Sequence, residues 1–375
     1  MLRILALVPY KVYPAVMGGQ KGIALFYKYL SQYASLSVYT TRKNRVQDTT
    51  PEVMNTISNS KWRYVNPFIY FTMNKLAREK NVSHLLFEHP YYAWLIVLFS
   101  FNKSFKIIVH SHNIESERFR SVGKWWWKIL WYYERVAYRK ADFVWFKTQE
   151  DRFYAIKEYN ILRDKTWVVP YGVEQDSLPT ADDIQHSKTT ICNIHGIEST
   201  SKLLLFNGTL SYKPNMDALE HILRDINPLL LKKLSISYKI IVCGKGLSNE
   251  YDELNQFRKD HIIYAGFVED IDLYFRACDL FLNPLLDGGG IKTKLVEALG
   301  FGKAVVSTQN GAIGVDEKYC SGRLRIVGDY DWEQFANEIK QLLEQDIVNP
   351  HDEFYHQFAW KNIAENTYRA LISKQ

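Results

Sequence analysis

The sequence predicts an α/β protein with two doubly wound domains, each built on a parallel β-sheet covered by helices. Short apolar runs rich in Val, Ile and Leu alternate with helix-length segments along the whole chain, which is the pattern of parallel sheets. The runs form two series, separated by a polar stretch at residues 176–202. The chain has 375 residues, which is more than one hydrophobic core normally supports.

The predicted strands are short, and each is followed by a turn or a helix-length segment. The first series lies at Arg3–Val8, Ser37–Thr41, Leu85–Glu88, Lys106–His110, Phe143–Lys147 and Trp167–Pro170. The second series lies at Leu203–Asn207, Tyr238–Cys243, Ile262–Ala265, Leu280–Asn283, Ala304–Ser307 and Leu324–Val327. Open parallel sheets bind ligands at the carboxyl ends of their strands, so residues that directly follow a strand are the candidates for function.

The same pattern predicts the domain organisation. We expect a first domain at residues 1–175, a linker with one short helix at 176–202, a second domain at 203–355 and a C-terminal helical segment at 356–375.

Composition excludes several classes of protein. The formal charge of +6 is too small to indicate a nucleic-acid partner. The four cysteines are far apart in the sequence, which is typical of a reducing compartment. The N-terminal apolar run at residues 4–8 is too short for a signal peptide. The longest apolar run, at 91–101, is shorter than the roughly 20 residues of a membrane span and predicts a buried helix. We therefore expect a cytoplasmic protein that could touch a membrane surface.

A glycine-rich turn leads into a lysine-bearing helix at residues 284–307. The glycines allow the backbone to approach a ligand closely, and the N-terminus of the helix predicted at 291–299 adds about half a positive charge. Two lysines add two full charges. The turn predicts a diphosphate site made by Gly288, Gly289, Gly290, Lys292 and Lys294.

Glu297 follows Lys294 by three residues and shares its helical face. A carboxylate in this place would repel phosphate, so we expect it to accept hydrogen bonds from the two hydroxyl groups of a ribose. The alternative is a glycine-rich loop beside a surface Lys–Glu pair.

This stretch resembles the donor-site motif of retaining glycosyltransferase family 4, whose GT-B fold has two Rossmann-type domains facing across a cleft. The family pattern G-x-G-x-R/K-x-K-x-x-E-A, then G-x-P/A-V-V, stands here as Gly288, Gly290, Lys292, Lys294, Glu297, Ala298, Gly302, Ala304, Val305 and Val306. The resemblance implies that the lysines neutralise the donor diphosphate and that Glu297 binds ribose. Many members carry a glutamate near the sugar where this chain has Gly289, so backbone N–H groups of 288–290 or Asp287 would take its place.

Other segments resemble the family in the same order along the chain. They are residues 168–174, 206–222, 238–246 and 262–284. In the second of these Thr209 stands where the family has an arginine, and the resemblance implies that Lys213 substitutes as a phosphate contact. It also implies that the last helix, near 358–373, crosses back to the first domain.

The first domain supplies the remaining candidates. Gly18 and Gly19 match the glycine pair of the family's first loop, although a structural turn is the alternative. The segment from 109 to 120 resembles the family's H-N-x-E, which implies that His112 lies near the reacting sugar with Asn113 and Glu115 beside it. Glu88 and His89 follow another predicted strand, and His89 ranks lower because it could simply end that strand before Pro90.

An aromatic and basic helix is predicted at residues 124–140. Its core stripe would comprise Trp126, Ile129, Leu130, Tyr133, Val136 and Ala137. Its other faces would carry Trp125, Trp127, Trp131, Tyr132 and Tyr138 beside Lys124, Lys128, Arg135 and Arg139. Such residues suit a helix at a membrane surface, and packing between domains or between two copies of the chain is the alternative.

No metal is expected. Asp329 and Asp331 imitate the metal-binding D-x-D of another glycosyltransferase fold, but Asp331 with Gln334 matches a capping box for a helix that begins at Trp332.

The predicted reaction moves a sugar from a nucleoside diphosphate to an acceptor hydroxyl with retention, in polysaccharide or glycolipid biosynthesis. The acceptor would be a saccharide or a lipid-linked molecule. Two alternatives stay open: a nucleotide-sugar epimerase of the same fold, and a two-lobed protein that binds a small ligand without turnover. A dinucleotide dehydrogenase is disfavoured because no G-x-G-x-x-G follows the first strand.

Overall fold

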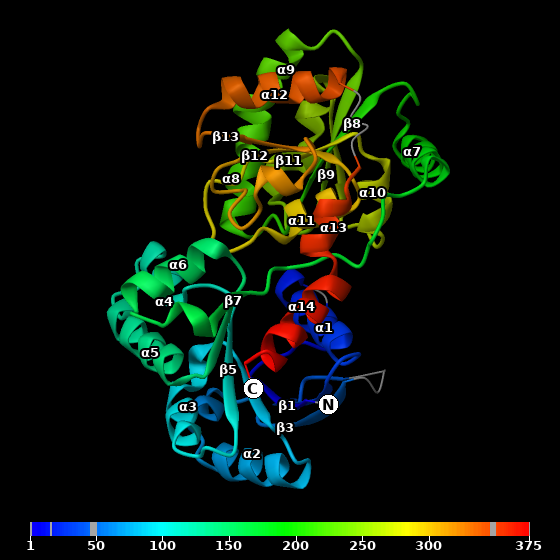
Figure 1. The fold of residues 1–375 in the computed structure, drawn as a ribbon. Helices are drawn as coiled ribbons and strands as arrows, with labels where there is room; N and C mark the ends of the chain where they lie inside the picture. The colour runs from blue at the N-terminus through cyan, green and yellow to red at the C-terminus, as the bar shows by residue number, and fades with distance from the viewer. Residues whose placement is uncertain (1, 16, 46–50, 346–349, 375) are drawn as a thin grey trace. The chain divides into compact units, whose positions relative to one another are not determined.

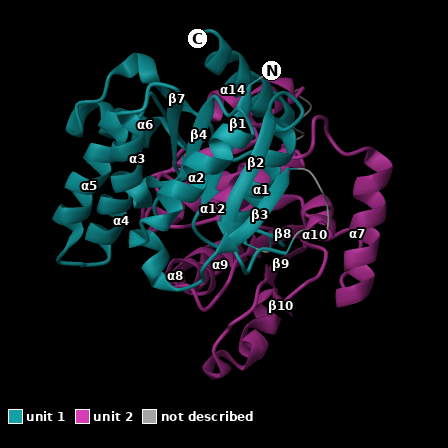
Figure 2. Ribbon diagram, turned by 90° about the horizontal axis from the view of Figure 1, so that it is seen from below, with its two compact units in different colours: residues 1–172, 289–291, 360–375 teal, residues 173–288, 292–359 magenta. Residues whose placement is uncertain are grey.

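A computed structural model describes residues 2–15, 17–45, 51–345 and 350–374 of the chain (Figure 1). The chain divides into two compact units, which have different colours in Figure 2. Unit 1 comprises residues 1–172, 289–291 and 360–375, and unit 2 comprises residues 173–288 and 292–359. Both units consist of a parallel sheet with helices, which is the predicted fold class.

Unit 1 contains a seven-stranded parallel sheet with the order β3-β2-β1-β4-β5-β6-β7. Leu5, Leu86 and Val109 of its central strands are fully buried, so these strands are apolar on both faces, as parallel strands covered by helices must be. The strands are β1 (Arg3–Val8), β2 (Ser35–Thr41), β3 (Glu52–Ile57), β4 (His84–Glu88), β5 (Lys106–Ser111), β6 (Phe143–Phe146) and β7 (Thr166–Val168).

Every strand predicted from the sequence is present in one of the two sheets, and among the described residues the sheets hold one further strand, β3. It pairs with β2 in parallel at the edge of the sheet. Most of its residues are exposed or only half-buried. An edge strand of this kind lacks the apolar run by which the others were recognised.

The helices of unit 1 follow its strands in alternation. They are α1 (Gly18–Leu30), η1 (Lys61–Val65), α2 (Phe68–Glu79), η2 (Pro90–Tyr92), α3 (Ala93–Ser100), α4 (Glu115–Ser121), α5 (Trp127–Lys140), α6 (Gln149–Glu158), η3 (Arg163–Lys165) and α14 (Trp360–Ile372). Most of the apolar run at 91–101 forms α3, as predicted, but the helix is only partly buried: Ala93, Leu95, Ile96 and Phe99 are buried, whereas Leu98 is exposed. In the described part of the chain, no helix combines the length and apolarity that a membrane crossing requires.

Unit 2 contains a six-stranded parallel sheet with the order β10-β9-β8-β11-β12-β13. Its strands are β8 (Lys202–Asn207), β9 (Tyr238–Cys243), β10 (Ile262–Gly266), β11 (Leu280–Asn283), β12 (Ala304–Thr308) and β13 (Leu324–Val327). Its helices are α7 (Ala181–His195), α8 (Lys213–His221), η4 (Ile222–Ile226), α9 (Asn227–Lys233), η5 (Asn249–Asp260), α10 (Ile271–Ala277), α11 (Thr293–Gly300), η6 (Glu317–Tyr319), α12 (Trp332–Glu344) and α13 (Asp352–Phe358).

The stretch at 176–202 differs from the linker that the sequence suggested. Most of it forms α7, a helix of 15 residues, and the whole stretch belongs to unit 2. Thr180 caps the N-terminus by accepting from the Asp183 N–H, and Gly196 ends the helix in the left-handed conformation. The two caps and the buried residues Ile191 and Cys192 stabilise a helix whose polar composition resembles that of a linker.

The exposed face of α5 also differs from the prediction. Ile129 and Val136 were assigned to its core stripe but are exposed, whereas Glu134 and Tyr138 are buried. The helix takes this orientation because Glu134 accepts hydrogen bonds from the first N–H groups of α4. Three apolar residues of α5 left in solvent have helical spacing, Ile129, Tyr132 and Val136, and the exposed Trp125 just before the helix extends this stripe.

The last helix, α14, is counted with unit 1. The Trp360 ring lies 6.2 Å from that of Phe26, and Tyr368 stacks on Tyr33 at 5.9 Å. Both partners of α14 belong to α1 or the turn that follows it, so the C-terminal segment packs on the first helix of the chain.

Candidate functional site

The glycine-rich turn after β11 leads into the N-terminus of α11. Gly288 has φ +99° and Gly290 has φ +70°, and residues with a side chain rarely adopt this left-handed conformation. The helix begins at Thr293, with Lys292 as its N-cap. The Lys292 ammonium donates to the Gly288 carbonyl oxygen. The turn is therefore held by its own lysine, close to the positive end of the helix.

Lys294 and Glu297 form an ion pair on α11, with 3.0 Å between Nζ and Oε2. The side chain of Lys294 is 34% exposed and that of Glu297 is 15% exposed. The next residues, Leu295 and Val296, point into the core and are fully buried. The Lys294 ammonium, the Glu297 carboxylate and the N-terminus of α11 thus lie close together. The positive groups can bind an anion, and the carboxylate can accept hydrogen bonds from hydroxyl groups.

Lys213, the other predicted phosphate contact of unit 2, begins α8 and is 81% exposed. Its ammonium pairs with the Asp217 carboxylate, which offsets the charge that a phosphate would meet. Lys213 and Asp287 line the same hollow of about 320 Å³, together with His221 and Tyr330. Lys213 therefore lies near Asp287, the residue before Gly288, in a hollow lined by both positive and negative side chains.

The predicted glycine pair of unit 1, Gly18 and Gly19, forms the first residues of α1. A Cβ added to Gly19 would meet nothing within 4 Å. Packing inside the chain therefore does not require a glycine at this position.

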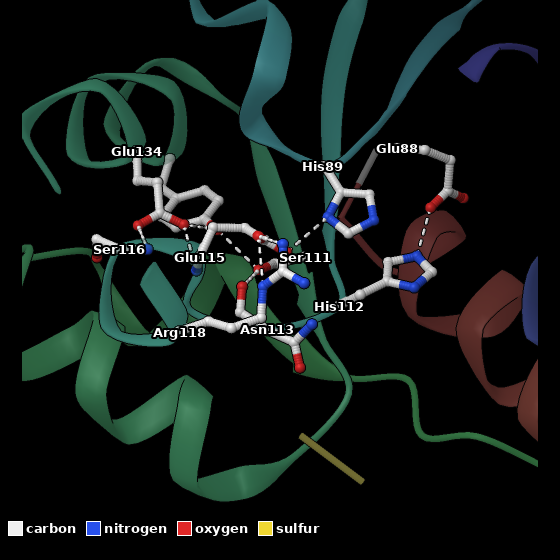
Figure 3. A network of polar contacts seen from close by, with 10 residues as sticks. Glu88, His89, Ser111, His112, Asn113, Glu115, Ser116, Arg118 and Glu134 are labelled. Atoms are coloured by element: carbon white, nitrogen blue, oxygen red, sulfur yellow. Dashed lines mark hydrogen bonds and ion pairs between the residues drawn. The ribbon is translucent and has the colours of Figure 1, made fainter. Parts of the chain in front are cut away.

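Three polar side chains meet where β4 and β5 end. Glu88 is the last residue of β4, and its Oε1 lies 3.0 Å from Nδ1 of His110 in β5. Its Oε2 lies 2.6 Å from Nε2 of His112, a contact drawn in Figure 3. Tyr27 of α1 donates to the same carboxylate at 2.6 Å. Glu88 and His110 are buried, and 12% of the His112 side chain is exposed.

His89 supports His112 from the other side. Its imidazole stacks on that of His112 with 4.4 Å between ring centroids and 23° between planes. Its Nδ1 lies 3.4 Å from Oε1 of Glu115, which also pairs with Arg118 (Figure 3). The backbone of His89 has φ +64° and ψ 161°, a region that costs a residue with a side chain about 1–3 kcal/mol. Such strain persists where the surroundings hold a residue in place.

The electrostatics of this cluster favour a charged Glu88 and neutral imidazoles. Burial by itself would raise the pKa of Glu88, but the adjacent imidazoles of His110 and His112 and their hydrogen bonds hold it well below its usual value. Burial lowers the pKa of His110 to about 4. Burial and the neighbouring His89 hold the pKa of His112 well below its usual value.

Two family models match the chain, one in each half of the sequence. Residues 31–177 match Glycosyltransferase Family 4, and residues 201–345 match Glycosyl transferases group 1. The chain belongs to the group 1 glycosyltransferases of family 4. A similar curated protein is the chitobiosyldiphosphodolichol beta-mannosyltransferase of Debaryomyces hansenii, 23% identical over 311 residues. That match covers 74% of this glycosyltransferase and 65% of the relative.

Solved structures of low sequence identity share the fold of the glycosyltransferase. The sucrose-phosphate synthase of Thermosynechococcus elongatus aligns with a TM-score of 0.71 at 14% identity, over 100% of both chains. Anabaena HepE, solved in complex with UDP, aligns with a TM-score of 0.74 at 16% identity, over 99% of this chain and 100% of that one. These alignments confirm the GT-B fold.

A buried carboxylate anchors the helix that follows His112 in the glycosyltransferase. Glu134 of α5 accepts from the backbone N–H groups of Glu115 and Ser116 at 2.8 and 2.9 Å (Figure 3). Tyr159 donates to it at 2.9 Å. Because burial dominates, the pKa of Glu134 is raised despite these hydrogen bonds. The carboxylate satisfies the otherwise unpaired first turn of α4, which carries Glu115 toward His89.

Two groups of side chains resemble metal sites. The side-chain ligand atoms of Glu88, His110 and His112 lie within 4.8 Å of one another, a spacing that could hold an ion. Hydrogen bonds among these three groups and from Tyr27 account for the arrangement. The D-x-D imitation is a helix cap, because Asp331 accepts from the Gln334 N–H at 3.0 Å. The absence of a metal requirement stays a prediction.

The sequence did not single out His110 or Lys147. His110 lies opposite Glu88 in the pairing of β4 and β5, and it alternates with His112, a spacing of two that could have marked a pair at a strand end. Lys147 follows β6, is 4% exposed, and lies 5.7 Å from the Phe26 ring centroid. Burial lowers its pKa to about 8.

Proposed function

We propose that this glycosyltransferase moves a sugar from a nucleoside diphosphate sugar to an acceptor hydroxyl, with retention of anomeric configuration. The observation that carries the proposal is the Lys294–Glu297 pair at the start of α11, behind the turn with left-handed Gly288 and Gly290. Retention rests on the resemblance to the family motif. The sugar donors of solved neighbours, such as the UDP-glucose bound to Anabaena HepE, support a nucleotide donor of this class.

The chemistry of transfer demands stabilisation of the leaving diphosphate. Charge grows on its oxygens as the bond to the sugar breaks, and Lys292, Lys294 and the helix N-terminus supply positive charge where it develops. Glu297 accepts from the ribose hydroxyls, and His112 contacts the sugar. In this proposal the lysines do the work that a divalent metal does in other transferases, so no metal is needed.

We further propose a lipid-linked saccharide as the acceptor, used at the cytoplasmic face of a membrane. The curated relative acts, by its name, on a saccharide attached to diphosphodolichol. On unit 1, the exposed apolar stripe of α5 is flanked by the exposed cations Lys124, Lys128, Arg139 and Lys140. Exposed apolar residues continue on α2 and beside α3 with Phe68, Phe71 and Phe101. Apolar side chains among basic ones match an anionic lipid surface.

Acceptor-dependent release of nucleoside diphosphate tests the transfer. A thermal-shift panel of nucleotide sugars first identifies the donor, since a ligand that binds the folded state raises its melting temperature. With that donor, release of diphosphate is expected only when a saccharide or lipid-linked saccharide is added, and a chelator should leave the rate unchanged. The product linkage, read by proton NMR, should keep the anomeric configuration of the donor.

Three results would contradict the proposed transfer. Conversion of the donor into a stereoisomer without acceptor would identify an epimerase. Binding without turnover would identify a ligand-binding protein. Loss of activity on chelation would overturn the metal-free mechanism.

Flotation with vesicles tests the membrane contact. Vesicles with anionic lipid are expected to bind the protein at low salt and release it as salt rises, because each basic residue near the surface contributes about 1 kcal/mol. Ile129→Glu places a charge in the middle of the stripe and should lower vesicle binding by about tenfold or more. Ile194→Glu, at an equally exposed position on α7 of unit 2, is the matched control. Equal vesicle binding by the two variants would contradict the membrane proposal.

A further inference from the structure

The Glu88 carboxylate accepts hydrogen bonds at both of its oxygens. Oε1 receives Tyr27 and His110, and Oε2 receives His112 at 2.6 Å. The residue is 1% exposed. A buried carboxylate of this kind is costly unless its oxygens are satisfied, and here the three side chains satisfy it. These contacts also fix the position of the proton on His112.

An ionised carboxylate can only accept, so each imidazole nitrogen that faces Glu88 carries its proton. His112 faces Glu88 with Nε2. A neutral imidazole has one N–H, so its other nitrogen, Nδ1, is left as an acceptor. The carboxylate thereby decides which of the two nitrogens of His112 can receive a hydrogen bond from a ligand.

At the other oxygen of Glu88, Oε1, the position of the proton on His110 is also fixed. His110 faces Glu88 with Nδ1, and its Nε2 is buried without a hydrogen-bond partner among the described residues. A proton moved to Nε2 would be an unsatisfied buried donor, which costs about 1–3 kcal/mol. His110 therefore keeps its proton on Nδ1 and requires an acceptor at Oε1.

The orientation of the His112 ring is set as well as its tautomer. The hydrogen bond to Oε2 restrains one edge, and the His89 ring covers a face at 4.4 Å. His89 is itself held by the contact of its Nδ1 with Glu115 and by its strained backbone at φ +64°. A ring restrained in this way presents its remaining nitrogen in one direction, which is what a group that touches a sugar requires.

We propose that Glu88 is a positioning residue that holds His112 in the Nε2–H tautomer, so that Nδ1 accepts a hydrogen bond from a hydroxyl of the bound sugar. The inference rests on the proposed sugar transfer. The proposal implies that the enzyme prefers sugars with a hydroxyl group that can donate to His112 Nδ1. It also implies that His89 and Glu115 help to hold the His112 ring in place.

The tautomer of His112 is measured directly by NMR. Protein labelled with 15N in its histidines gives long-range spectra in which Nε2–H and Nδ1–H imidazoles differ, and the His112→Asn variant identifies the His112 signals. The neutral Nε2–H form is expected at pH 7. A His112 protonated on Nδ1 in the unmodified protein would overturn the proposal without reference to any variant.

Glu88→Gln reverses the hydrogen bond. The amide oxygen should turn toward Tyr27 and His110, where two donors require it, which directs the amide N–H₂ to His112. The His112 proton should then move to Nδ1. A nitrogen that donates would then face the sugar hydroxyl, and kcat/KM for transfer should fall by about 10- to 100-fold. Tyr27→Phe removes a different hydrogen bond from the same carboxylate and should leave the tautomer of His112 unchanged.

The readouts separate this inference from the proposed function. A Glu88→Gln variant with the Nδ1–H tautomer and unaltered kcat/KM would overturn the positioning role. The absence of any sugar transfer by the unmodified protein, with His112 in the Nε2–H form, would remove the proposed function and the catalytic meaning of the tautomer together. Transfer by a protein whose His112 carries its proton on Nδ1 would remove this inference alone.

Discussion

Lys294→Ala is expected to lower kcat/KM for sugar transfer by about 100- to 1,000-fold, the loss typical of removing one charged group from a developing anion. Lys294 lies on the first turn of α11, where its charge adds to that of the helix N-terminus. Its removal also takes away the ammonium that lies 3.0 Å from the Glu297 carboxylate. Single-turnover rates and donor affinity, measured separately, test the prediction.

The partner of Lys294 should respond differently. Glu297→Ala is expected to weaken donor binding by about tenfold or more and to affect kcat less, because ribose contacts exist before and during transfer. Lys318→Ala is the control for Lys294→Ala, since Lys318 is likewise a lysine paired with an acid, Asp316 at 2.8 Å, elsewhere in unit 2. Loss of activity in the control, or unchanged donor affinity in Glu297→Ala, would contradict the proposed donor site.

The local geometry of the glycine-rich turn could be predicted because its parts are adjacent in the sequence. Left-handed glycines, a helix N-terminus and a Lys–Glu pair three residues apart all lie between 288 and 297. Each has a local signature that needs no knowledge of tertiary contacts. The strands were predictable for the same reason, except for β3, whose exposed residues carry no apolar signal.

The cluster around Glu88 could be predicted only in part, because it depends on pairing between strands. Glu88 and His112 were recognised as separate candidates at strand ends. The pairing of Glu88 with His110 follows from the register of β4 against β5, and Tyr27 comes from α1. Neither contact can be deduced from a single segment, so only the folded structure shows that two imidazoles share the Glu88 carboxylate.

The face of α5 shows how one buried polar residue can override periodicity. Apolar residues recur at helical spacing on more than one side of this helix, so the core stripe was ambiguous. Glu134 decides the orientation because its carboxylate accepts hydrogen bonds from the N-terminal N–H groups of α4. Charged residues are rarely fully buried, and a pattern analysis therefore places them in solvent.

Glu134→Gln is expected to destabilise unit 1 by about 2–4 kcal/mol, although the two side chains have nearly the same shape. Both carboxylate oxygens accept from a backbone N–H, one from Glu115 and one from Ser116. An amide offers one acceptor and one donor, so either orientation places an N–H₂ against a backbone N–H. Urea unfolding followed by tryptophan fluorescence measures the effect, because eight of the ten tryptophans precede residue 170.

The control for this prediction is Glu158→Gln, at an exposed position on α6, which should change the free energy of unfolding by less than about 0.5 kcal/mol. Glu134→Ala should cost about 3–5 kcal/mol, because it also leaves the Tyr159 hydroxyl without this acceptor and opens a cavity. If Glu134→Gln unfolds at the same urea concentration as the unmodified protein, the two backbone N–H groups do not depend on this carboxylate. The first turn of α4, and with it the contact of Glu115 with His89, would then need a different anchor.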